Sequence, residues 1–171
     1  MIRLFGLSII VVACILSGMY FGSVYGFRVE DLKNFKKALV ILKSEIEYMG
    51  TPLYQAFRNI SDKLKGSPVS NIFYDFSEQI ENQVFPDIAI SNCLEKYYKT
   101  MYISQSDIDS IKSFGKTLGY LDKNLQLNNI ELTLNYLNER IEEEAQYHIK
   151  YKKMYQTLGI LAGILVVVIL I

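Results

Sequence analysis

The sequence has few of the residues from which metal centres and disulfide-bonded scaffolds are built. Among its 171 residues there are one histidine, His148, and two cysteines, Cys14 and Cys93. A single imidazole excludes a cluster of histidine metal ligands. Cys14 lies in an apolar run and Cys93 in a polar region, so we do not expect them to pair. A free thiol in the polar part suits a reducing compartment.

An excess of charge of one sign is also missing. The 18 acidic residues balance the 18 basic ones, so the formal net charge is zero. Zero net charge gives no reason to expect a nucleic-acid partner. The 13 tyrosines have no basic cluster among them that would turn them into a platform for stacked bases. We therefore predict no nucleic-acid partner.

Two long runs near the ends of the sequence carry no charge. Neither residues 4–27 nor residues 154–171 contain an Asp, Glu, Lys or Arg. A helix rises about 1.5 Å per residue, and about 17 to 25 apolar residues cross the hydrocarbon core of a bilayer. We predict a transmembrane helix over each run, a polar domain over residues 28–153 between them, and membrane lipids as partners.

Basic residues border both apolar runs on the side of the polar domain. They are Arg28, Lys33, Lys36 and Lys37 after the first run, and Lys150, Lys152 and Lys153 before the second. Because basic residues accumulate on the cytoplasmic side of membrane helices, this pattern places the polar domain in the cytoplasm and both termini across the membrane.

The first apolar run also allows a second interpretation. Val11 to Cys14 resembles the signal for a lipid-anchored cysteine, which would place the following domain outside the cell. Apolar character continues past Cys14 to Phe27, however, and the basic borders oppose an outward domain. We therefore favour a retained transmembrane helix and keep the lipoprotein as an alternative.

Glycines recur every four residues in both apolar runs. Gly18, Gly22 and Gly26 lie in the first run, and Gly159 and Gly163 in the second. Small residues at this spacing let two helix backbones approach closely in lipid. The pattern leaves open whether the two runs pack on each other or on other membrane subunits.

Helical spacing dominates the polar domain, and no stretch alternates long enough to indicate a strand. Apolar residues from Leu32 to Met49 form a heptad seam that Gly50 ends. Thr51 is predicted to cap the next helix, with Pro52 at its first position. Further helices are expected after Ser67-Pro68, after Asp87 as a cap and through Tyr98 and Met101, after Ser104 or Ser106, and after Gly119. The prediction is an all-α fold: a six-helix domain of two three-helix antiparallel halves, flanked by N- and C-terminal transmembrane helices.

Motifs for chemistry are weak. Gly115-Lys116-Thr117 is not a phosphate-binding loop, because the required glycine five positions earlier is Ser110. Three consecutive acids, Glu142, Glu143 and Glu144, form either a solvated face or a docking patch for a partner. We predict no catalytic residue, no metal site, no cofactor and no small-molecule ligand, so the protein is not expected to be an enzyme.

Three stretches together resemble the stage III sporulation protein AB family. The first runs from Glu45 to Leu53 and includes Tyr48, Thr51 and Pro52. The second contains Phe114, Gly115, Leu118 and Gly119, and the third is the terminal run from Leu158 to Gly163. The order and spacing of these stretches and the total length agree with the family, so the resemblance covers essentially the whole chain.

The resemblance implies a membrane protein of endospore-forming bacteria, placed in the mother-cell membrane around the forespore. Proteins of the family are similar to the cytoplasmic domains of the platform protein of type II secretion and type IV pilus machines, which are six-helix bundles. The resemblance also implies a scaffold subunit of a secretion-like channel complex, coupling a cytosolic secretion-type ATPase to membrane ring proteins. The signature residues would then be structural or lie at an interface.

A membrane sensor is the competing class of function. Two transmembrane helices around a helical bundle are also the layout of a receptor with an external ligand-binding domain. Such a receptor carries its bundle outside the cell, whereas the basic borders of this sequence face the bundle. We therefore favour the scaffold.

Overall fold

The computed structural model describes residues 2–119 and 122–170, which contain six α-helices and no strand. The all-α prediction with six helices is confirmed. The helices are α1 (Ile2–Ser44), α2 (Leu53–Lys63), α3 (Pro68–Glu81), α4 (Pro86–Tyr97), α5 (Gln105–Gly115) and α6 (Lys123–Leu170). A π-helix, η1 (Glu45–Met49), follows α1, and a 3₁₀ turn, η2 (Tyr98–Thr100), follows α4.

The chain divides into two compact units. The first, which we call the helix pair, contains the residues up to Val29 and those from Glu142 onward. The second, the helical domain, is Glu30–Ile141. Helices α1 and α6 contribute to both units, and α6 continues without a break from the helical domain into the apolar run.

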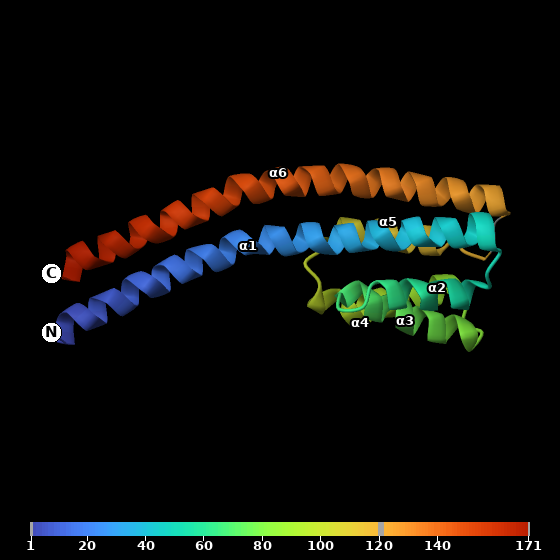
Figure 1. Cartoon of the computed structure of the whole chain (residues 1–171), viewed down its shortest axis with the longest axis horizontal. Helices are drawn as coiled ribbons and strands as arrows, with labels where there is room; N and C mark the ends of the chain where they lie inside the picture. Colours follow the sequence, from blue (N-terminus) through green and yellow to red (C-terminus); the bar gives the residue numbers. More distant parts are fainter. Residues whose placement is uncertain (1, 120–121, 171) are drawn as a thin grey trace. The chain divides into compact units, whose positions relative to one another are not determined.

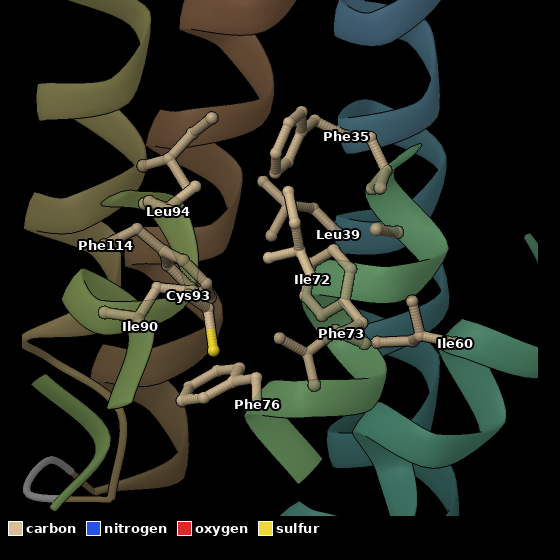
Figure 2. Close-up of a cluster of buried hydrophobic side chains, with 14 of the residues drawn as sticks. Phe35, Leu39, Ile60, Ile72, Phe73, Phe76, Ile90, Cys93, Leu94 and Phe114 are labelled. Carbon is tan, nitrogen blue, oxygen red and sulfur yellow. The ribbon is translucent and has the colours of Figure 1, made fainter. Parts of the chain in front are cut away.

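Large apolar side chains from all six helices meet in the core of the helical domain. Figure 2 shows Phe35 and Leu39 of α1, Ile60 of α2, Phe73 and Phe76 of α3, Ile90 and Leu94 of α4, and Phe114 of α5 pointing into one cluster. The Phe57 and Phe76 ring centroids lie 4.3 Å apart, and those of Phe57 and Phe73 lie 5.8 Å apart. Each such side chain contributes about 1.5–3 kcal/mol when fully buried.

The turns between the helices begin and end largely where glycine, proline and serine predict. Gly50, Gly66 and Gly119 have φ angles of 59°, 94° and 81°, a left-handed conformation that favours glycine. Ser67 caps α3 with Pro68 at its first position. Ser104 caps α5 through a reciprocal capping box with Asp107. Short turns bring consecutive helices from α2 to α5 into contact.

Two predicted caps are wrong. Pro52, rather than Thr51, occupies the N-cap position of α2, because the Thr51 hydroxyl donates instead to the Glu45 carboxylate at 2.8 Å. Phe85 precedes α4, with Pro86 as its first residue, so Asp87 lies inside the first turn. The same helix ends at Tyr97, so Tyr98 and Met101 lie beyond it.

The predicted seam of α1 also ends early. Leu32, Phe35, Leu39 and Leu42 are buried as expected, but Met49 is 70% exposed. The cause is η1, because a π-helix has wider turns than an α-helix and rotates the residues that follow. Met49 therefore lies on the surface of the domain, whereas Glu45, three residues after the buried Leu42, lies inside it.

Candidate functional site

The helix pair brings the predicted glycine faces together within one chain. Figure 1 shows the first part of α1 and the last part of α6 running side by side. A Cβ added at Gly18 would lie 2.6 Å from the Tyr155 backbone oxygen, and the Gly18 Cα lies 3.3 Å from the Cβ position of Gly159. One at Gly22 would lie 3.1 Å from the Lys152 Cα. The two backbones therefore approach as closely as glycine allows, because glycine has no side chain.

The same contact continues on both sides of Gly18. Gly163 of α6 faces Cys14, with 3.6 Å between its Cβ position and the Cys14 Cβ. Gly26 faces the His148 ring, whose Cε1 would lie 2.9 Å from an added Cβ. Because rising numbers on α1 meet falling numbers on α6, the two helices are antiparallel. All five predicted glycines lie at this contact.

An ion pair and stacked rings border the glycine contact. Arg28 Nη2 lies 3.2 Å from Glu144 Oε1, and the Glu144 side chain is only 5% exposed. Tyr25 of α1 stacks on Tyr151 of α6 with 5.1 Å between ring centroids, and Tyr155 packs beside Tyr151 at 6.4 Å. Aromatic rings of this kind gather where a membrane protein meets the headgroups.

The acidic docking patch is wrong for Glu144. Glu142 and Glu143 are exposed, but Glu144 is buried against Arg28. The physical reason is helical geometry: consecutive residues point about 100° apart, so three adjacent acids cannot share one solvated face. Sequence reasoning placed Arg28 only in the basic border and missed its partner.

The first signature stretch encloses a buried carboxylate. Glu45 is 3% exposed, accepts a hydrogen bond from the Thr51 hydroxyl at 2.8 Å, and accepts a second from the Asn59 side-chain amide at 3.1 Å. It thereby ties η1 to the turn and to α2. The neighbouring Tyr48 is 80% exposed, while Pro52 is exposed and Leu53 is half-buried. Glu45 and Thr51 therefore hold the turn, and Tyr48 faces outward.

The second signature stretch makes a close helix crossing. A Cβ at Gly115 would collide with Ile90 Cγ2, so only glycine lets α5 approach α4 this closely. Phe114 and Leu118 are buried, and the Cβ position of Gly119 lies 3.4 Å from Pro86 Cγ. These residues pack the domain and present no reactive group.

Asp107, which the sequence analysis passed over, is the most densely bonded carboxylate among the described residues. It is fully buried, accepts from the Ser104 backbone N–H at 2.9 Å, the Tyr136 hydroxyl at 3.0 Å and Arg140 Nε at 3.1 Å. Burial alone would raise its pKa, but these hydrogen bonds, with one from the Ser104 hydroxyl, hold the pKa below its ordinary value. It fixes α5 against α6.

Two further buried groups were also missed. Asp31 of α1 is 5% exposed and accepts from the Tyr102 backbone N–H at 2.8 Å; burial raises its pKa. Burial, together with the nearby Asp75 carboxylate, raises the pKa of the Cys93 thiol to about 12. Such a thiol is unreactive near neutral pH. No sequence signal marks these groups, because their partners are distant along the chain.

The described part of the chain holds no group of three or more His, Cys, Asp or Glu side chains placed to bind a metal ion. Two of its helical stretches, Ile9–Met49 and Lys123–Ile169, contain windows long and apolar enough to cross a bilayer, by length and composition. Few residues of those windows are buried inside the protein.

Comparison with known proteins gives a consistent result along the chain. The family model described as stage III sporulation protein AB matches residues 3–171. The stage III sporulation protein AB of Bacillus subtilis (strain 168) is 33% identical over 171 residues, covering 99% of both chains. A solved structure of stage III sporulation protein AB has a TM-score of 0.67 and 30% identity, covering 72% of this chain and 97% of that one.

Proposed function

We propose a function from one premise: the chain belongs to the stage III sporulation protein AB family. The protein acts as a non-enzymatic membrane scaffold in sporulation, a subunit of a secretion-like channel complex between mother cell and forespore. It lies in the mother-cell membrane around the forespore, with the helical domain in the cytosol and both termini across the membrane. There it links a cytosolic secretion-type ATPase to membrane ring components.

One observation carries this proposal: the two apolar ends of the chain pack into a single antiparallel helix pair. The backbone of α1 meets that of α6 at Gly18 and Gly159, while the helical domain forms a compact unit of its own. An anchor at both ends and a packed domain between them suit a subunit that holds a position. The buried carboxylates inside the domain, such as those of Asp107 and Glu45, accept hydrogen bonds from other side chains.

One end of the helical domain supports a contact with a partner. Lys123 Nζ donates to the Glu47 backbone oxygen at 2.7 Å, and Gly119 lies against Pro86, so three turns meet there. Four of the exposed side chains at this end are large and apolar. They are Tyr48 (80% exposed), Met49 (70%), Phe85 (61%) and Leu125 (50%). Exposed apolar clusters of this kind mark contact surfaces for other proteins.

Membrane topology tests the proposal directly. Asn135 is exposed on α6 within the helical domain, so Asn135→Cys, in a Cys14→Ala/Cys93→Ala background, offers one accessible thiol. A membrane-impermeant thiol reagent should label it only after the cells are permeabilised. Labelling of intact cells would place the domain outside and contradict the scaffold in favour of a sensor or a lipoprotein.

The partner contact is tested separately by co-purification. Tyr48→Ser should reduce recovery of the cytosolic ATPase with the membrane-extracted chain. Tyr98→Ser is the matched control, because Tyr98 is 40% exposed and lies in η2, at a turn distant from η1. Equal recovery with both variants would remove this surface from the proposal.

A further inference from the structure

We infer that the helix pair binds one anionic phospholipid, with an acyl chain in a groove between α1 and α6 and the headgroup at the Lys150 ammonium group beside its mouth. The inference rests on the membrane embedding in the proposed function, and adds a ligand and a site to it. Three features of the helix pair support it.

The first feature is an apolar groove. It has a volume of about 500 Å³ and is lined by α1 between Ile9 and Gly18 and by α6 between Tyr155 and Ala162. Pockets of about 300–1,000 Å³ accommodate small organic ligands. The lining hydroxyl of Ser17 is not available to a polar ligand, because it donates to the Ala13 backbone oxygen at 2.8 Å. The groove therefore suits a hydrocarbon chain.

The second feature is the length of the groove. Ile9 to Gly18 rises about 14 Å along α1, and Tyr155 to Ala162 about 11 Å along α6. The hydrocarbon core is about 30 Å thick, so the groove has the depth of one leaflet. One leaflet is the depth of an acyl chain, whereas a helix of another subunit would cross both leaflets and need a groove about twice as long.

The third feature is the charge beside the mouth. Tyr155 lines the groove and packs against Tyr151 at 6.4 Å, and Lys150 Nζ lies 5.8 Å from the Tyr151 ring centroid. The Lys150 side chain is exposed. A continuous surface thus leads from hydrocarbon through aromatic rings to one ammonium group. An amphipathic ligand with an anionic head, such as phosphatidylglycerol, matches that order.

Native mass spectrometry of the purified full-length chain tests the inference. The detergent-solubilised chain is mixed with equal amounts of phosphatidylglycerol and phosphatidylcholine, and the retained lipid is counted. We expect a preference for phosphatidylglycerol. Lys150→Gln should lower that preference by about fivefold. Lys63→Gln/Lys99→Gln, which removes two exposed lysines from the helical domain, should leave it unchanged.

A second pair of variants tests the groove. Ala13→Phe/Ala162→Phe fills the groove with two rings and should reduce retention of both lipids severalfold. Val12→Phe/Leu161→Phe adds the same two rings to the same helices at exposed positions outside the groove lining, and should retain lipid like the original chain.

Two outcomes would overturn the inference. They are equal retention of the two lipids by the original chain, and unchanged retention in the filled-groove variant. Thiol labelling of Asn135→Cys is independent of lipid retention, so a failure here leaves the scaffold proposal standing, and an external domain would contradict the scaffold alone.

Discussion

The helix pair and the helical domain are each stabilised internally, by small side chains in the first and by large side chains in the second. In the helix pair, glycines form the contact, and large residues such as Leu16 (59% exposed) and Val168 (71%) point away from it. In the helical domain, Phe35 and Phe57 are buried to 1% and 0% exposure, and most charged residues lie outside. The two units of the same chain are thus packed in different ways.

This contrast reflects the solvent that surrounds each unit. Water drives large apolar side chains into a core, because burying their surface is favourable. Lipid gives no such drive, so helices associate where small residues allow close van der Waals contact. Each prediction below changes one unit at a residue on which its own kind of packing or bonding depends.

The largest effect is expected in the helix pair, where one glycine substitution should prevent an engineered disulfide between α1 and α6 from forming. Gly163→Cys would place its Cβ about 3.6 Å from that of Cys14, within the range of a disulfide. In a Cys93→Ala background, an oxidant should join most chains internally, read as a mobility shift on a non-reducing gel. Adding Gly18→Leu should abolish the shift, because Gly18 faces the Tyr155 backbone.

Gly6→Leu is the matched control, because nothing lies within 4 Å of a Cβ at Gly6. The internal cross-link should survive this change. A disulfide that forms between two chains instead of within one would show that the glycine faces pair between copies.

In the helical domain, the largest effect comes from a fully buried leucine. Leu137→Ala should lower the free energy of unfolding by about 2–5 kcal/mol, since Leu137 is 0% exposed and the change leaves a cavity. The measurement is urea unfolding of the detergent-solubilised full chain, followed by circular dichroism.

Leu132→Ala makes the same change on the same helix, five residues away, where the side chain is 67% exposed. It should alter the free energy of unfolding by no more than about 0.5 kcal/mol. Equal losses from the two variants would contradict the buried position of Leu137.

An intermediate effect is expected at Asp107. Asp107→Asn should lower the free energy of unfolding at pH 7 by about 1.5–3 kcal/mol, because hydrogen bonds to a charged group are lost. The folded state lowers the pKa of Asp107 below 3.8, so its stabilisation is present above that pH and disappears as the pH falls through the folded pKa.

The difference in free energy of unfolding between the original chain and Asp107→Asn should therefore disappear as the solution is acidified below about pH 4. The measurement is urea unfolding at each pH. A difference that stays constant with pH would mean that the carboxylate charge contributes nothing to stability.

The smallest effect is expected at Asp31. Burial raises its pKa above 3.8, so the charged form costs stability, and the folded state gains stability as the pH falls from its raised pKa toward 3.8. Asp31→Asn removes the charge but keeps an oxygen for the Tyr102 N–H. We expect a change within about 1 kcal/mol at pH 7 and no gain on acidification. A large loss at pH 7 would show that the charge itself is needed.

Local signals account for what the sequence predicted well. Glycine at Gly50, Gly66 and Gly119 and the serine before Pro68 act within a few residues, so the ends of the helices follow from them. The four-residue repeat of glycines that includes Gly18 in the first run and Gly159 in the second likewise predicted helices that pack closely. The choice between packing within and between chains depended on residues more than 100 positions apart, which spacing does not encode.

Long-range partners account for what was missed. Thr51 was expected to cap α2, but Glu45 takes its hydroxyl. Glu144 was read as solvated, but Arg28 lies across from it on another helix. Asp107 was passed over, although its contact with Arg140 on another helix determines its role. In each case a polar side chain found its partner through tertiary packing.

The wide turn at Glu45–Met49 has a consequence for anyone who recombines this domain with a relative. Because η1 sets which residues after Ser44 face inward, the number of residues between Ser44 and Gly50 matters as much as their identity. Deleting one of them would restore ordinary helical phase and rotate the residues that follow, which include the exposed Met49. Chimeras joined at this point should therefore preserve the residue count before they preserve the side chains.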